Sequence, residues 1–187
     1  GDPSAPPLLI TSKVELAHPA LNADAYLLAR KFGLAPEQKA FLFKMVQSLL
    51  PTKERLARIG RAPSPECTFC QAQEDNTLHL LSCTQGSEVT SPLLRCLADH
   101  VSNLTHQNLV LLNISLSESM ELPVTWLLST CLMLVWEERA AGRTARLTTC
   151  QAELQARLLV LKHTRWKNYS LHNSAVLLEE MMNLHFK

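Results

Sequence analysis

The chain has little of what enzymes commonly need at a catalytic centre. Its aspartates are Asp2, Asp24, Asp75 and Asp99, and no two of them are paired as a two-metal polymerase or nuclease centre requires. The sequence also lacks a Gly-rich phosphate loop, a Gly-x-Ser-x-Gly nucleophile elbow and a His-Glu-x-x-His pair. It therefore predicts a protein that is not an enzyme.

Long apolar runs are absent as well. The longest one, Val124 to Trp136, includes the polar residues Thr125, Ser129 and Thr130. It is shorter than the roughly 20 residues that a bilayer core needs. We therefore expect a buried helix in a folded domain and no membrane contact.

Cysteine is used sparingly for a chain of 187 residues, which has six. Three of them, Cys96, Cys131 and Cys150, are scattered singly through apolar stretches, and no secretory signal precedes them. A disulfide framework is therefore disfavoured. The expected compartment is reducing and intracellular, either the nucleus or the cytoplasm.

The other three cysteines lie close to a histidine in the sequence. Cys67 and Cys70 are separated by two residues, eight more lead to His79, and three more lead to Cys83. Thiolates and imidazole are good zinc ligands, and four protein ligands give the closed coordination of a structural site. The sequence predicts one structural Zn²⁺ bound by these four residues. The alternatives are a cluster of buried free cysteines with a core histidine, or a disulfide pair.

The predicted site has two halves of different local structure. The Cys-x-x-Cys turn can place two sulfurs on one side of a tight knuckle, while His79 and Cys83, four residues apart, share a face of a helix. Asp75 or Asn76 is expected to cap that helix, because a short polar side chain can accept its first free N–H groups. A thiolate committed to zinc is not free to attack a substrate, which disfavours a nucleophile made of Cys83 and His79.

A longer pattern surrounds these ligands. It comprises Leu49-Leu50-Pro51-Thr52, Leu56, Gly60, Pro65, Cys67, Cys70, Glu74-Asp75, His79-Leu80-Leu81 and Cys83. With it, residues 39–84 resemble the zinc-binding segment near the C-terminus of reverse transcriptases of non-LTR (LINE-type) retrotransposons. A weaker resemblance continues through Trp126 and Trp136-Glu137 to Trp166. The spacing differs from that of the short retroviral nucleocapsid knuckle, whose mode of binding is therefore not transferred.

Hydrophobic periodicity predicts a mainly α fold, a helical bundle with a small structural zinc knuckle. Helices are expected from Asn22 to Gly33, from Pro36 to about Leu50, and after Thr52, the last with Leu56 and Ile59 inward. Later helices are expected over 88–101, 123–141, 144–168 and 173–184, while 108–115 could be a strand or a loop. The predicted divisions are an extended arm or linker (1–21), N-terminal helices (22–62), the zinc-binding segment (63–84) and a C-terminal bundle (85–187) that packs with 22–62 as one domain.

One predicted helix carries an apolar stripe that has two interpretations. Its members recur at steps of three or four: Leu147, Cys150, Leu154, Leu158 and Leu161. A coiled coil needs three or four heptads, so we interpret the stripe as a seam within the bundle rather than as a dimer contact. Dimerisation is the alternative.

The net charge of +1 conceals an uneven distribution. Residues 30–62 hold eight Lys or Arg and two Asp or Glu, residues 63–122 hold one and seven, and residues 123–169 hold seven and three. If zinc brings the basic helices together, a positive face could attract phosphates, and the Arg-Trp-Lys run could also stack on unpaired bases. The candidate nucleic-acid-binding residues are Lys53, Arg55, Arg58, Arg61, Arg143, Arg165, Trp166 and Lys167. The alternative is that these cations are the solvated sides of ordinary helices.

The predicted function combines these features. In the family that the segment resembles, polymerase and endonuclease lie upstream, which implies an accessory role here or in a host protein derived from that family. That role is to bind RNA or DNA and position it for target-primed reverse transcription, beside the remainder of the reverse transcriptase. The alternative is a structural or protein-interaction module that docks on the polymerase body or on a host factor.

Overall fold

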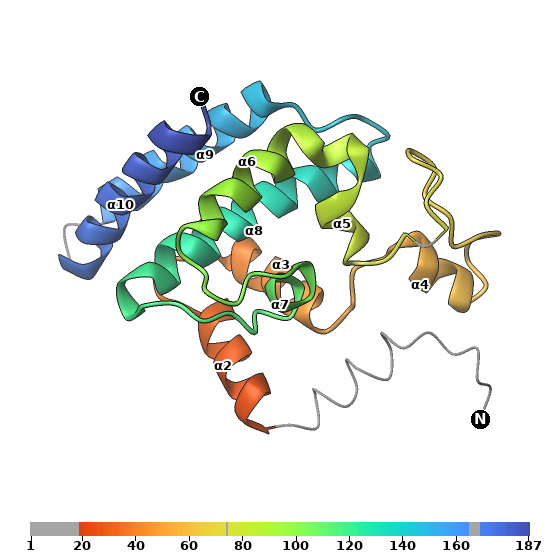
Figure 1. Cartoon of the computed structure of the whole chain (residues 1–187), viewed down its shortest axis with the longest axis horizontal. Helices are drawn as coiled ribbons and strands as arrows, with labels where there is room; N and C mark the ends of the chain where they lie inside the picture. The colour runs from red at the N-terminus through yellow and green to blue at the C-terminus, as the bar shows by residue number, and fades with distance from the viewer. Residues whose placement is uncertain (1–18, 74, 165–168) are drawn as a thin grey trace.

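The computed structural model describes residues 19–73, 75–164 and 169–187 (Figure 1). Helices make up 65% of the described residues, and no strand occurs among them. The prediction of a mainly helical fold is therefore confirmed. In chain order the elements are α2 (Pro19–Ala29), α3 (Pro36–Val46), α4 (Lys53–Arg58), α5 (His79–Ser82), the 3₁₀ turn η1 (Thr84–Gly86), α6 (Ser87–Ala98), α7 (His106–Val110), α8 (Glu118–Ala140), α9 (Leu147–Thr164) and α10 (Tyr169–His185).

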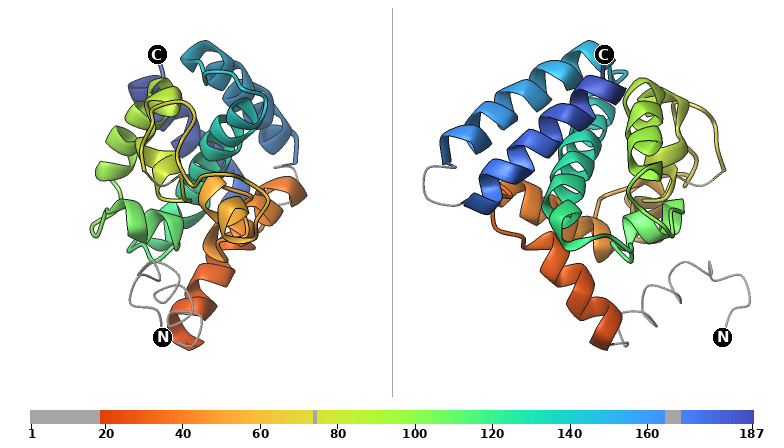
Figure 2. Two further views of the ribbon diagram at one scale, coloured as in Figure 1. Left: turned by 90° about the vertical axis from the view of Figure 1, so that its right-hand side faces the viewer. Right: turned by 60° about the vertical axis from the view of Figure 1, so that its left-hand side comes forward.

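Helix α8 forms the centre of the fold. It packs against α2, α3, α5, α6, α9 and α10, and Figure 2 shows it between the α9–α10 pair on one side and α6 on the other. Its residues from Leu122 to Val135 are all buried. A helix that is apolar all round must be covered on all sides, which explains why this sequence lies in the middle of the bundle.

The start of α8 differs from the prediction that Pro123 opens the helix. The helix begins at Glu118, and Pro123 lies inside it. Proline lacks the N–H that would bond to the carbonyl of Ser119, four residues earlier. Ser119 is exposed, so water can hydrate that carbonyl instead. The helix therefore tolerates the proline near its solvated end.

By length and composition α8 could cross a membrane, because it has 23 residues and a mean hydropathy of 1.3 over its most apolar window. In this fold 83% of that window is buried against other helices. A buried core helix passes the same test, so this single helix is weak support for a membrane span.

The N-terminal helices pack on α8 and turn the chain toward the predicted metal segment. Pro36 occupies the first turn of α3, as predicted. However, α2 already begins at Pro19 rather than after Asn22, and α3 ends at Val46 rather than near Leu50. The backbone turns beyond α3, which leaves Leu49 41% exposed and Leu50 only 2% exposed. If α3 ran to Leu50, as predicted, Leu49 would share the buried face of Leu42 and Met45, so its exposure follows from the earlier end of the helix.

A buried glutamine joins α3 to α8. Gln38 is 1% exposed. Its Nε2 donates to Ser129 Oγ and Thr130 Oγ1, both at 3.0 Å, and to the carbonyl of Trp126 at 3.3 Å. Its Oε1 accepts the N–H of Ala35 at 2.8 Å. Buried polar groups need partners, and these bonds specify how the two helices meet.

The last two helices form a hairpin along one side of α8 (Figure 1). The predicted stripe on α9 is buried at Cys150, Leu154, Leu158 and Leu161, and Leu147 is half-buried. Because α9 packs on both α8 and α10, the stripe is a seam within one chain. Helix α10 begins at Tyr169 rather than Asn173. The ambiguous stretch 108–115 forms the end of α7 and a following loop.

Candidate metal centre

The four predicted metal ligands lie together beside the end of α8. The sulfur atoms of Cys67, Cys70 and Cys83 and a ring nitrogen of His79 are all within 4.8 Å of one another. The Sγ atoms of Cys67 and Cys83 are 3.8 Å apart, and Cys70 Sγ is 3.2 Å from His79 Nε2. A metal–sulfur bond of about 2.3 Å places two tetrahedral sulfurs roughly 3.8 Å apart. This group could therefore hold one metal ion.

The first half of the cluster is a tight backbone turn, as predicted. The N–H of Cys67 donates to the carbonyl of Ala72 at 2.9 Å, and the N–H of Gln71 donates back to the carbonyl of Cys67 at 3.0 Å. The N–H of Phe69 also points at Cys67 Sγ, at 3.4 Å. The turn thus places both cysteines on one side and aims a backbone donor at a sulfur.

The second half is the single helical turn α5, which brings His79 and Cys83 together. The side chain of Asn76 accepts the N–H of His79 at 3.0 Å, so the expected capping role belongs to Asn76. Leu80 and Leu81 are each 2% exposed and anchor α5 in the core. Packing therefore fixes this half of the cluster before any metal binds.

The surroundings of Cys67 and Cys83 shift the pKa values of these two thiols in opposite directions. Cys67 and Cys83 are each 1% exposed. Burial acts to raise the pKa of Cys67, but hydrogen bonds from backbone N–H groups, from His79 and from Arg139 outweigh burial and lower it to about 6. Burial raises the pKa of Cys83 to about 11. The turn therefore stabilises a thiolate at Cys67, the form that binds metal.

A residue that sequence reasoning missed completes the site. Arg139, near the end of α8, is 9% exposed. Its Nη2 donates to Asp75 Oδ1 at 2.6 Å and lies 3.7 Å from Cys67 Sγ, while its guanidinium carbon is 5.2 Å from the centre of the Phe69 ring. Asp75, the other expected helix cap, binds this arginine instead. The available signal was a cation at the end of an apolar helix, but it lies 72 positions from Cys67.

The donor set and its neighbour fit a bound cation. Three thiolates around a divalent ion give a net negative centre, and a buried guanidinium is the group that can offset such charge. Arg139 Nη1 is buried and has no hydrogen-bond partner among the described residues. The arginine is thus only partly satisfied by Asp75, which is consistent with a further anionic neighbour at the cluster.

The predicted nucleic-acid-binding residues occupy two places. Lys53, Arg55 and Arg58 are on α4 and Arg61 follows it, whereas Arg143 follows α8. Arg58 forms an ion pair with a glutamate one turn earlier in α4, and Arg143 makes two bonds, of 2.7 and 3.0 Å, to a glutamate of α8. The remaining candidates, Arg165, Trp166 and Lys167, lie outside the described residues.

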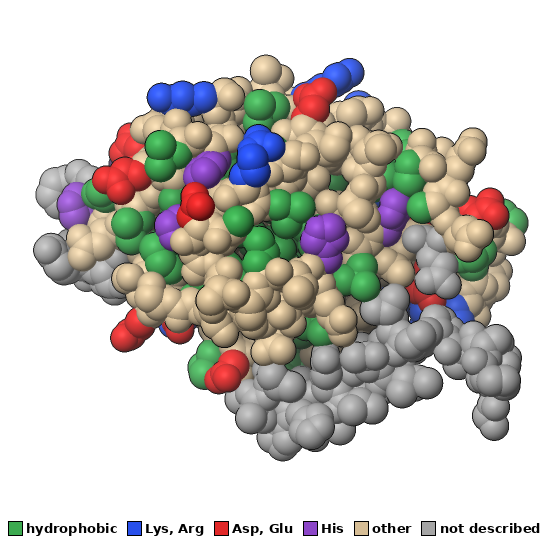
Figure 3. Space-filling model, in the orientation of Figure 1, with side chains coloured by type: hydrophobic (Ala, Val, Ile, Leu, Met, Phe, Trp, Pro, Cys, Tyr) green, Lys and Arg blue, Asp and Glu red, His purple; other side chains and the backbone are tan. Residues whose placement is uncertain are grey.

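Several cations in the later half of the chain form ion pairs, whereas two of the cations on or next to α4 do not. In the later half Arg146, Arg157 and Lys162 all pair with glutamates, at distances from 2.6 to 2.9 Å. In contrast, Lys53 and Arg61 form no ion pair with any acid that the structure describes. On the face shown in Figure 3, acidic, cationic and histidine side chains are interspersed without a continuous basic patch. Two cations on or next to α4 are thus without an ion pair among the described residues.

Helix α4 is attached to the metal segment rather than to the core. Thr52 caps it by accepting the N–H of Arg55 at 3.3 Å, as predicted. The helix buries no residue, and Ile59, expected to face inward, is 59% exposed. Its first turn is held by the N–H of Glu54, which donates to the carbonyl of Asp75 at 3.2 Å. The prediction for Ile59 was wrong because α4 is held by its Thr52 cap and by this bond to Asp75, and not by burial of its apolar side chains.

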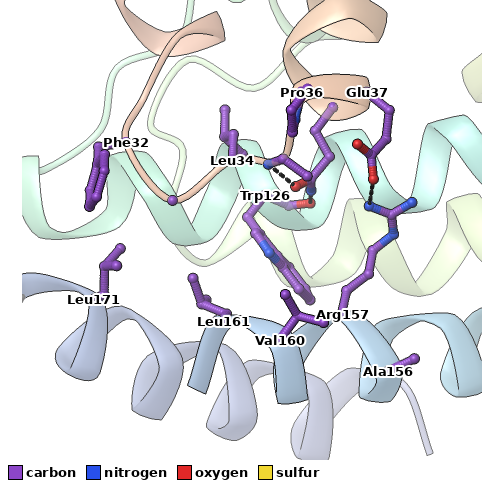
Figure 4. A pocket seen from close by; sticks show the side chains of 13 residues that line it. Phe32, Leu34, Pro36, Glu37, Trp126, Ala156, Arg157, Val160, Leu161 and Leu171 are labelled. Carbon is purple, nitrogen blue, oxygen red and sulfur yellow. Dashed lines mark hydrogen bonds and ion pairs between the residues drawn. The ribbon is translucent and has the colours of Figure 1, made fainter. Parts of the chain in front are cut away.

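A separate pocket of about 470 Å³ lies between the α2–α3 turn, α8 and α9. Figure 4 shows Trp126 pointing toward Val160 and the ion pair of Glu37 with Arg157 at one side. Apart from Gln38 and this pair, its lining is apolar. It offers no pairing of a nucleophile with a base.

Comparison of the chain with protein-family models, curated proteins and solved structures finds no match.

Proposed function

We propose that this chain is a non-catalytic, zinc-stabilised domain that binds RNA or DNA. Following the resemblance of residues 39–84, it is an accessory domain of a LINE-type reverse transcriptase, or of a host protein derived from one. It positions template RNA or target DNA for target-primed reverse transcription inside the cell. The observation that carries the proposal is the cluster of three cysteines and a histidine beside helix α4, whose Lys53 has no acidic partner among the described residues.

The ligand chemistry supports zinc in a structural role. Thiolates and imidazole select borderline-soft metal ions, and the 3.8 Å separation of two sulfurs suits tetrahedral zinc. Four protein ligands leave no open position for a reactive water. When bound, zinc would supply structural cross-linking, and Cys67, Cys70, His79 and Cys83 would hold it.

The metal would also hold α4 in place. That helix has no buried residue of its own, and its first turn bonds to Asp75. Asp75 in turn donates its N–H to the carbonyl of Pro65 at 2.8 Å and accepts from Arg139. A metal that stiffens residues 67–83 would therefore orient the cations of α4 relative to the bundle.

The unpaired cations supply the sites for phosphate. Lys53 is half-buried and Arg61 is exposed, and neither has an acidic partner within the described ranges. Arg55 donates weakly to the carbonyl of Ser48 at 3.4 Å. A phosphate can bind these cations without breaking an existing ion pair. Arg58 and Arg143 would first have to release their glutamates, so we rank them below the other three.

A second candidate function rests on exposed apolar side chains. Phe32 is 69% exposed and Val160 is 65% exposed, and both line the pocket of Figure 4. Leu159, the residue before Val160 in α9, is 57% exposed but does not line this pocket. Apolar side chains gathered around a hollow are typical of a protein-docking surface. In this case the domain would dock on the polymerase body or a host factor. Zinc would then only stabilise the fold in place of a larger hydrophobic core.

Metal analysis and nucleic-acid binding test the proposal together. Zinc stoichiometry is measured on the purified chain, and anisotropy is measured with single-stranded, duplex and nicked probes over a salt series. Each phosphate contact adds about 0.7 to 0.9 to the slope of log affinity against log salt. The double substitution K53E/R61E is therefore expected to reduce the slope by about 1.4 to 1.8 and to weaken every probe.

The matched control is R95E against R61E. Arg95 is also exposed but lies on α6, in the acidic part of the chain. We expect R95E to leave the slope almost unchanged. If the wild type ignores all probes at low salt but retains a protein partner, the nucleic-acid function is wrong and docking replaces it. If R95E weakens binding as much as R61E, the assignment of the phosphate contacts to the cations at α4 is wrong instead.

A further inference from the structure

We propose that Arg139 is the charge partner of the metal centre and couples metal binding to the central helix of the bundle. This inference rests on the proposed zinc site and adds a positioning residue to it. Arg139 is contributed by α8, whereas all four ligands come from residues 67–83. Arg139 therefore joins the turn that contains Cys67 to the core, whereas α5 is packed there through Leu80 and Leu81.

The contacts of Arg139 surround the first half of the cluster. One nitrogen, Nη2, reaches both the carboxylate of Asp75 and the sulfur of Cys67, at 2.6 and 3.7 Å. The guanidinium lies against the ring of Phe69. Phe69 is the second of the two residues between Cys67 and Cys70. Arg139 thus contacts the turn at two places: the sulfur of Cys67, which is a proposed ligand, and the ring of Phe69, which is not.

The charge balance at the cluster explains why a buried cation lies beside it. Zinc with three thiolates and a neutral imidazole carries a net charge of −1, and Asp75 adds another −1 beside it. Arg139 supplies the one buried cation that the structure describes at this cluster. Its free Nη1 is a donor that Asp75 does not use. The guanidinium is therefore placed to offset the negative charge of the loaded centre.

Partners in the second coordination layer of a metal site are worth roughly 10- to 100-fold in metal affinity. We expect R139M, which keeps much of the volume but removes the charge and the donors, to lower zinc affinity by at least about tenfold. R139K keeps the charge without the planar fork and should fall between the wild type and R139M. The matched control R143M removes a cation that is 64% exposed and pairs with Glu138.

The experiment uses the full chain. Zinc affinity is measured by competition with a chromogenic chelator, and the charge-transfer band of the Co²⁺-substituted protein is recorded. Removing a donor from a thiolate raises the energy of its lone pairs, so the band of R139M should move to longer wavelength. Circular dichroism of the metal-free and loaded forms verifies folding, and R139K keeps the test valid if R139M does not fold.

The outcomes separate this inference from the proposed function. If the wild type binds neither zinc nor Co²⁺ in tetrahedral thiolate coordination, the proposed metal site itself fails. If the wild type binds but R139M and R139K match it in affinity and in band position, only the role of Arg139 fails. An equal loss in R143M would also overturn it, because the effect would then be one of general charge.

Discussion

Removing the metal should loosen one side of this protein and leave the bundle folded. The ligands lie in residues 67–83, and the helix that depends on them, α4, buries no residue. In contrast, α8 is buried along most of its length and is covered by α3, α6, α9 and α10. A chelator is therefore expected to free α4 and the turn that contains Cys67 while the central helices persist.

The size of the effect follows from mass action and from the length of the elements. Metal at a free concentration 1,000 times its Kd stabilises the folded state by about 4 kcal/mol. For a domain of this size, that corresponds to a Tm change of about 8 to 16 °C. Helix loss should be small, because α4 and α5 contain only six and four residues.

The assay combines thermal unfolding, circular dichroism and amide exchange with and without chelator. Faster exchange is expected at the amides of Cys67, Gln71 and Glu54, whose bonds hold the turn and α4. The variant C70S should show no chelator response. The control C96S removes a buried thiol of α6 that is not a ligand, so it should lower Tm yet retain the chelator-dependent shift.

Two results would refute this reasoning. An unchanged Tm after complete chelation would mean that the four side chains do not bind metal with useful affinity. Loss of the whole helical signal would mean that the bundle has no stability of its own, contrary to the burial of α8.

Two further predictions concern the bundle itself. The substitution Q38M removes a side chain that makes four hydrogen bonds and leaves the N–H of Ala35 without its partner. The free energy of unfolding in urea should therefore fall by about 1 to 3 kcal/mol. A decrease below about 0.5 kcal/mol would contradict this prediction. The pKa of Glu37 is lowered by its backbone N–H and by Arg157, so its contribution is present above the unfolded value of 4.5 and is lost as pH falls through the lower folded value. Because Glu37 is half exposed, the difference between wild type and E37Q should be below about 1 kcal/mol at pH 7 and should shrink as the pH falls below 4.5, and a difference that grows on acidification would contradict it.

The helices could be predicted from local patterns, but several of their ends could not. Thr52 and Pro36 have the side-chain chemistry that starts a helix regardless of context, and both do so here. Pro123 has the same chemistry but lies inside α8, because exposure of the preceding turn lets water replace a lost bond. Leu49 and Leu50 show the same limit, since the turn after α3 decides which of them is buried.

The sequence by itself determined the cluster of ligands, because Cys67 and Cys70 share one turn, His79 and Cys83 share one helical turn, and short chain segments bring such neighbours together. It also determined the mainly helical fold through the spacing of apolar residues. Only the tertiary structure decided that Arg139 reaches this cluster, because that contact joins positions 72 residues apart in sequence and requires α8 to be packed in place. It also decided the ion pairs that join separate helices, such as that of Arg157 with Glu37. Local spacing can therefore identify a group of side chains that could hold a metal ion, while packing brings Arg139 to that group.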